Sequence, residues 1–302
     1  MRTREARPSI ENSLSGDLWF TVSNRWFLGE RDILMRTFEE QERQRREDIL
    51  RLSFFDAGIW IGRPQGFPLA HACEAADLPA ILKKHFLTGG LVSHWRGKAV
   101  SAQDGNESLT AVMEERSNPD LFAVWTGLPL FPRDNGLLPG NGEPPAVVKA
   151  VRIFPRTHNF PLAVWSVGTL MAWLHERHIP LLLFHTECAW NDLFTVAQAF
   201  PSLPVIVETQ TQKILYHTRP LFALMKACPN IRVELSNLCG AGMLEYTVRE
   251  FGADRLIYGS FLPVGDPLVP IGMVVDAAIS EQEKKAIAGE NLRRLIAEVR
   301  HG

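Results

Sequence analysis

The sequence predicts an α/β protein, a (β/α)8 TIM barrel with an N-terminal helical extension. Eight short apolar runs follow one another from about residue 52, as buried strands do. Segments with a helical period separate most of these runs, which indicates repeated βα units and a parallel sheet. The chain that remains after the extension has the usual size of such a barrel, about 250 residues.

The eight expected strands are, in order, LSFFDAG, GLVSHW, LFAVWTGLP, AVRIFP, IPLLLFHTE, LPVIVETQ, IRVELSN and RLIYGSF. Expected helices between them include residues 76–86, 107–117, 162–178 and 190–200. An open doubly wound sheet is the competing architecture. It is disfavoured because no glycine-rich phosphate loop follows the first strand.

The sequence divides into an extension, residues 1–50, and the barrel, residues 51–302. The extension starts with a polar leader and continues with an aromatic patch, LWFTVSNRWF, over 18–27. A long charged helix is expected from about residue 28 to residue 49. The patch is expected to pack on the main body, and patch and helix together are a candidate surface for a homo-oligomer or a protein partner.

Composition excludes several classes of partner. The formal net charge is −2, with 32 basic and 34 acidic residues and no long basic run, so no nucleic acid is expected. No segment approaches the roughly 20 apolar residues of a membrane span. The four cysteines have no metal-site or disulfide spacing, which is typical of a reducing compartment. We therefore expect a soluble, cytoplasmic protein without a membrane partner.

In a barrel, functional side chains come from the carboxyl ends of the strands and the loops that follow. Reading those ends gives the candidate residues Asp56, Trp60, Arg152, Arg156, His158, His185, Glu208, Glu234 and Phe261.

Four sequence blocks resemble the amidohydrolase-related family of metal-dependent hydrolases, over residues 52–296. FDAGIWIG is similar to that family's D-x-H-x-H-x-G block, and IPLLLFHTE to its P-v-x-x-H-x-g block. FGADRLIYGSFLP resembles G-x-D-R-i-x-f-G-S-D-x-P, and IAGENLRRLI resembles the closing helix. The resemblance implies a TIM barrel that hydrolyses amides or lactones, or decarboxylates, with a divalent metal that activates water.

The match to the family fails at the implied metal ligands. Gly58 and Trp60 stand where the family has the two histidines of strand one, and Phe261 stands where it has the aspartate of strand eight. Of the usual set only His185 remains. We expect Trp60 and Phe261 to pack together across the seam between strands eight and one. They would then fill the space that a metal occupies.

The remaining candidates each have a chemical and a structural interpretation. His185 is either a base, acid or ligand at neutral pH or a hydrogen-bonded remnant. Glu208 and Glu234 either join His185 in a substitute divalent-metal site or pair with the arginines. Asp56 is either a base or an acceptor for backbone amides.

Arg152, Arg156 and His158 suit a ligand carboxylate or phosphate, because a guanidinium offers a bidentate fork. The alternative is an ion pair with Glu208 or Glu187. Asp56, His185 and Glu208 are thus the candidate catalytic residues. Trp60, Glu234 and Phe261 join the basic residues as candidate substrate contacts.

Two functions remain open at this stage. The first is a hydrolase for a small carboxylate-bearing amide or lactone, with no cofactor and either metal-independent or altered chemistry. The second is a catalytically inactive barrel that binds a small acidic ligand or a protein partner. A divalent metal at His185, Glu208 and Glu234 is the alternative to a cofactor-free site, and the expected partner is a small anionic molecule.

Overall fold

The structure, a computed structural model, describes residues 38–301 except 69, 117, 130–143, 211 and 213. The expected aromatic patch at 18–27 lies outside the described residues. The chain separates into two compact units, residues 1–47 and 48–302. The charged helix expected over 28–49 lies partly outside the described residues. Its described part is α1 (Phe38–Leu52), which ends three residues later than expected.

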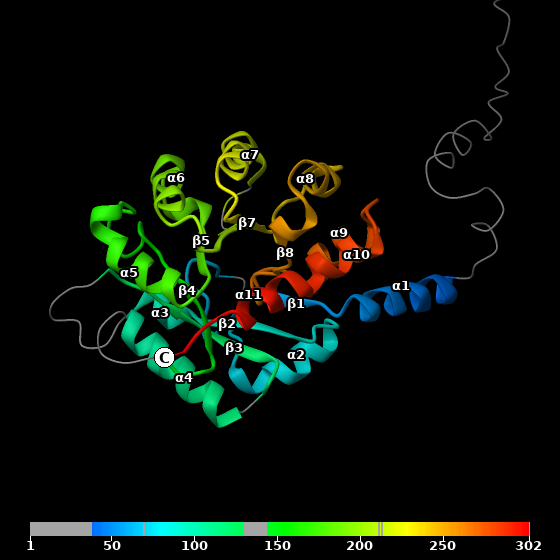
Figure 1. The fold of residues 1–302 in the computed structure, drawn as a ribbon. Coiled ribbons are helices and arrows are strands. Elements are labelled where there is room, and N and C mark those ends of the chain that lie inside the picture. The colour runs from blue at the N-terminus through cyan, green and yellow to red at the C-terminus, as the bar shows by residue number, and fades with distance from the viewer. Residues whose placement is uncertain are drawn as a thin grey trace, which may run out of the picture. The chain divides into compact units, whose positions relative to one another are not determined.

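Eight parallel strands form the predicted barrel (Figure 1), and each is found where the sequence placed it. They are β1 (Phe55–Ile61), β2 (Gly89–His94), β3 (Leu121–Thr126), β4 (Val148–Arg152), β5 (Leu181–Phe184), β6 (Val205–Glu208), β7 (Ile231–Glu234) and β8 (Leu256–Ile257). Neighbours in the chain are neighbours in the sheet. Two backbone hydrogen bonds join the last strand region to the first: Ala57 N donates to Tyr258 O (3.1 Å), and Trp60 N donates to Leu262 O (2.8 Å).

Helices lie outside the strands (Figure 1). They are α2 (Leu78–Lys84), α3 (Trp95–Ala99), α4 (Ala102–Arg116), α5 (Val164–Glu176), α6 (Trp190–Ala199), α7 (Thr218–Ala227), α8 (Met243–Phe251), α9 (Leu268–Asp276), α10 (Glu281–Lys285) and α11 (Asn291–Ala297). Short 3-10 turns are η2 (Ala75–Asp77), η3 (His185–Glu187), η4 (Ile214–His217) and η5 (Ala253–Arg255), and η6 (Ala286–Glu290) is a π-helical turn. Within the described residues, none of the helices has the length and hydropathy that crossing a membrane requires.

Helix α4 begins five residues earlier than the sequence indicated. The segment SAQDGN carries residues typical of a loop, and the expected helix therefore started at residue 107. In the structure the Ser101 hydroxyl accepts a hydrogen bond from the Asp104 backbone N–H (3.2 Å), which caps the first turn. The apparent loop residues are thus the amino end of the helix.

The core has three parts. One lies between the sheet and the surrounding helices, and a second fills the barrel with inward side chains such as Leu91, Leu182 and Ile206. Leu292 and Leu295 of α11 belong to this second cluster, so α11 covers the end of the barrel where the strands begin. The third part is aromatic and lies at the opposite end.

The first two strands approach so closely that Gly90 has no room for a side chain. A Cβ atom there would overlap the backbone carbonyl of Asp56, which is the register partner of Gly90 in the sheet. Backbone of a paired strand cannot move aside without breaking the ladder. The pairing of β1 with β2 therefore requires glycine at this position.

We expect Gly90→Ala to lower the free energy of unfolding by about 2 kcal/mol, the usual cost of overpacking. Urea unfolding followed by circular dichroism measures this change. The matched control is Gly168→Ala in α5, where a Cβ would make an ordinary 3.6 Å contact with Val164. That substitution should stabilise the helix by roughly 0.5–1 kcal/mol. Equal effects at the two positions would contradict the packing argument.

Candidate functional site

Five aromatic rings close the end of the barrel at which the strands finish. They are Trp60 of β1, Trp95 at the start of α3, Phe154 after β4, Phe184 of β5 and Phe261 after β8. All five are buried. Trp60 meets Phe261 edge to face, with ring centroids 6.2 Å apart, so the predicted contact across the seam is confirmed.

The backbone of β1 and the chain after β8 approach each other closely at the same place. A Cβ at Gly58 would lie 2.9 Å from the backbone nitrogen of Phe261, inside normal contact distance. A histidine there would force the chain at the end of β8 to move. The position at which the resemblance implies a metal ligand thus lacks both the ligand and the room for one.

Beneath the rings lies an ion pair between Arg152 and Glu208. Arg152 Nε is 2.7 Å from one carboxylate oxygen of Glu208, and Nη2 is 2.6 Å from the other. Arg152 also donates from Nη1 to the Ser93 hydroxyl, and its guanidinium carbon lies 4.5 Å from the centre of the Trp60 ring. Burial raises the pKa of Glu208, and Arg152 opposes that shift. The sequence suggested either a metal site or an ion pair with arginine for Glu208, and the structure shows the ion pair.

Asp56 joins the first strand to the last. One of its oxygens accepts from the backbone N–H groups of Gly58 (2.8 Å) and Ser260 (3.0 Å), and the other accepts from the Ser260 hydroxyl (2.5 Å). Burial raises the pKa of Asp56 to about 6, against these hydrogen bonds. The sequence suggested two roles for Asp56, a base or an acceptor for backbone amides. This geometry is that of the acceptor.

Glu234 has a comparable role between β6 and β7. It accepts from the backbone N–H (2.5 Å) and hydroxyl (2.8 Å) of Ser236 and from the backbone N–H of Thr209 (3.2 Å). Burial, together with the charge of Glu208, raises the pKa of Glu234 to about 7. Its oxygens therefore hold the loops that follow the two strands.

His185, at the start of η3, is 4% exposed. Its Nδ1 is 3.2 Å from the backbone carbonyl oxygen of Glu208, so Nδ1 carries the proton and Nε2 carries the lone pair. Nε2 is buried and has no hydrogen-bond partner within the described part of the chain. Burial lowers the pKa of His185, which favours the uncharged form of the ring.

The expected substitute metal site does not fit this geometry. Glu208 gives both oxygens to Arg152, and Glu234 gives both to Ser236 and Thr209. Across the part of the chain that the structure describes, no three or more His, Cys, Asp or Glu side chains form a group that could hold a metal ion.

The three residues expected to clamp an anion are not brought together. Arg152 is buried beneath the rings, whereas Arg156 is exposed, and its backbone N–H donates to Glu187 O (3.2 Å). His158 is half-buried and lies 2.9 Å from the backbone carbonyl of Lys98 through Nε2. Only His158 lines a cavity described here.

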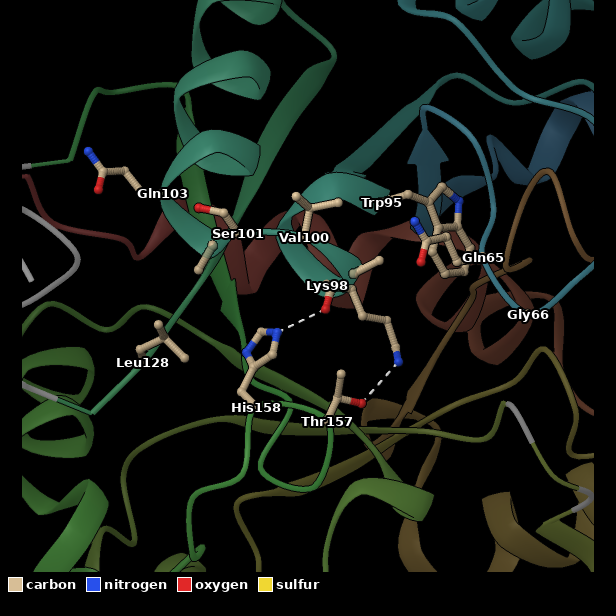
Figure 2. A pocket seen from close by; sticks show the side chains of 12 residues that line it. Gln65, Gly66, Trp95, Lys98, Val100, Ser101, Gln103, Leu128, Thr157 and His158 are labelled. Atoms are coloured by element: carbon tan, nitrogen blue, oxygen red, sulfur yellow. Dashed lines mark hydrogen bonds between the residues drawn. The ribbon is translucent and has the colours of Figure 1, made fainter.

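That cavity, the side cavity, has a volume of about 770 Å³, and Trp95, one of the five rings, lines it (Figure 2). The loops after β1, β2, β3 and β4 contribute to it, so it lies on the face where barrels carry their sites. Its polar lining residues are Gln65, Lys98, Ser101, Gln103, Thr157 and His158.

Lys98 is the cation of the side cavity. Its ammonium lies 3.2 Å from the Thr157 hydroxyl, as Figure 2 shows, 3.5 Å from Glu187 and 5.1 Å from the centre of the Phe154 ring. Sequence reasoning missed Lys98, because only the last residues of the second strand were considered and Lys98 follows them inside α3. The one available signal was a lysine within a turn of that strand end.

The fold defines the class: this is a (β/α)8 barrel. Structures similar to it include an Amidohydrolase 2 from Bifidobacterium longum subsp. infantis, with a TM-score of 0.57 and 18% identity, covering 81% of this chain and 98% of that one. A 5-carboxyvanillate decarboxylase from Sphingomonas paucimobilis matches with a TM-score of 0.59 and 11% identity over 82% and 99% of the two chains.

A third similar structure is a probable 2-pyrone-4,6-dicarboxylic acid hydrolase from Acinetobacter baumannii with citric acid bound. It has a TM-score of 0.58 and 11% identity, over 81% of this chain and 99% of that one. No family model matches the sequence, and no curated protein does. The comparisons confirm the fold that the sequence resemblance implied.

Arg152→Met should lower the free energy of unfolding by about 3–5 kcal/mol, because it leaves Glu208 buried without a counter-charge. The double variant Arg152→Met with Glu208→Leu should regain most of that loss, since an apolar pair has no charge to desolvate. A double-mutant cycle by urea unfolding measures the coupling. Additive effects of the two substitutions would show that the pair is not an energetic unit.

Glu234 predicts a pH dependence of stability. Its pKa is higher in the folded chain than the ordinary 4.5, so the folded state binds the proton more tightly. The stabilising contribution is complete below about pH 4.5 and is lost as the pH rises to about 7, on the order of 3 kcal/mol.

Glu234→Gln should flatten the pH profile of unfolding free energy in this window, while the exposed control Glu250→Gln keeps the profile of the parent. The slope is the readout, because the substitution also changes stability at every pH. An unchanged slope in Glu234→Gln would contradict the assignment.

Proposed function

We propose that this chain is a barrel that binds a small carboxylate in the side cavity and has no metal-dependent chemistry at the barrel centre. The observation that carries the proposal is the filled barrel mouth. Rings occupy it, and the Arg152–Glu208 pair lies directly beneath them. Neither Arg152 nor Glu208 is among the described residues that line the side cavity.

The lining of the side cavity supports an anionic ligand. Lys98 supplies a positive charge, and hydroxyl and amide groups such as Ser101 and Gln103 supply hydrogen bonds. The lining residues that the structure describes include no aspartate or glutamate. An ammonium on a partly buried wall favours a carboxylate over a neutral molecule, because the wall excludes part of the water that screens the attraction.

Glu187 holds Lys98 in position. The carboxylate is largely buried and accepts from the backbone N–H (2.9 Å) and hydroxyl (2.7 Å) of Thr157. It also lies near the ammonium, which anchors the lysine at the wall of the cavity. A positioned cation binds a ligand at a lower entropic cost than a mobile one.

The similar structures support the class of ligand. The names of two of them specify substrates with carboxyl groups, carboxyvanillate and pyrone dicarboxylic acid, and one contains citric acid. Fold alone does not transfer function, so this likeness indicates only which probes to use first.

A second candidate is metal-independent hydrolysis of a carboxylate-bearing amide or lactone. His185 favours it, because its Nε2 has no hydrogen-bond partner among the described residues and its lone pair is available to accept a proton, as a general base must. In this candidate Glu208 and Asp56 are not bases, since their oxygens are engaged with Arg152 and with Gly58 and Ser260. Lactone turnover that disappears in His185→Gln would favour hydrolysis over binding.

Binding of citrate tests the main proposal. Isothermal titration should show saturable binding to the parent chain and at least a tenfold weaker affinity in Lys98→Gln. Lys226→Gln, an exposed lysine of α7 away from the cavity, should bind like the parent. Equal citrate affinity in the two variants would reject the side cavity as the site.

Metal analysis of the purified chain tests the second half of the proposal. The expected result is no stoichiometric divalent metal in the parent or in His185→Ala. Stoichiometric zinc or manganese in the parent that is lost in His185→Ala would overturn the claim that the barrel centre works without metal.

A further inference from the structure

A second cavity, the apolar cavity, lies on the other side of the loop that follows β1. Its volume is about 610 Å³, within the range of sites for small organic molecules. The loop after β1, helix α2 and the loop after β8 surround it. Gly66 lines both cavities, so the loop after β1 separates them.

The inner wall of this cavity is apolar and fixed to the barrel. Phe67 and Val264 pack on the aromatic rings, and the Phe67 ring centroid is 5.6 Å from that of Phe261. Leu262 is buried and accepts a backbone hydrogen bond from Trp60. Cys73 is paired through its backbone with Gly62, at 2.7 and 3.3 Å. These contacts form the wall without a ligand.

Basic side chains lie along the rim. Lys84 and His71 are exposed, and His85 follows Lys84 at the end of α2. His85 Nδ1 is buried and has no hydrogen-bond partner among the residues that the structure describes. It lies 3.9 Å from a carboxylate oxygen of Asp266, which is exposed on the neighbouring loop. None of the described residues that line the cavity is acidic.

We propose that the apolar cavity is a second binding site, for a monocarboxylate with an apolar tail. The tail would contact Phe67, Ile81 and Val264, where it removes apolar surface from water. The carboxylate would lie at the rim, where Lys84 and the imidazole of His85 can donate to it. The site differs in chemistry from the side cavity, whose lining is polar, and does not depend on the function proposed for that cavity.

Isothermal titration with octanoate tests the proposal, with 1-octanol as the uncharged comparison. Octanoate should bind the parent chain with a stoichiometry of one and at least ten times more tightly than 1-octanol. Lys84→Glu should weaken octanoate binding at least tenfold. The neighbouring Lys83→Glu is the matched control, since it changes the same charge on the same helix but does not line the cavity.

A cavity-filling variant tests whether octanoate binds inside the cavity, without changing the charge at its rim. Ala72 lines the cavity and is exposed, so Ala72→Trp should block octanoate without disturbing the core, as an unchanged unfolding midpoint would verify. Citrate binding should persist in Lys84→Glu, and octanoate binding should persist in Lys98→Gln, so the two sites fail independently. Absent octanoate binding, equal effects of Lys83→Glu and Lys84→Glu, or full binding in Ala72→Trp would each overturn the proposal.

Discussion

The bidentate contact between Arg152 and Glu208 is the constraint around which the barrel mouth is built. A guanidinium inside a barrel must have a counter-charge, because desolvation of a single ion costs several kcal/mol. Glu208 supplies the charge from a neighbouring part of the sheet, and the flat guanidinium then offers a face to Trp60. The position of Trp60 in turn orders the other rings. The apolar cover and the buried charges therefore stabilise each other.

The other buried carboxylates at the barrel mouth also have a structural role. Asp56 binds the backbone at the seam between β1 and the chain after β8, and Glu234 binds the loops after β6 and β7. Side chains at strand ends are usually examined as catalytic groups. Here both are occupied by N–H and hydroxyl donors that would otherwise be buried without acceptors, so they determine the shape of this end of the barrel.

Much of the fold could be predicted from the sequence, because each strand is a buried apolar run and the eight runs recur at barrel spacing. The contact between Trp60 and Phe261 was predictable for the same reason, since a closed barrel brings its first and last strands together. The ion pair with Glu208 was one of two roles that the sequence suggested for Arg152, and the choice between pairing and ligand binding stayed open because both use the same side chains. Lys98 was missed because its role depends on Glu187, which is distant in sequence, and on the space between loops. Neither appears in a periodic pattern.

The contact between Trp60 and Trp95 gives this end of the molecule an optical signature. Their ring centroids are 4.5 Å apart with an interplanar angle of 31°, and both rings are held in a chiral, solvent-free environment. Two indoles in such an arrangement couple electronically and contribute to the near-ultraviolet circular dichroism, which vanishes when fixed tertiary packing is lost. The chain therefore carries an intrinsic spectroscopic reporter located at the barrel mouth, distinct from the far-ultraviolet signal of its helices.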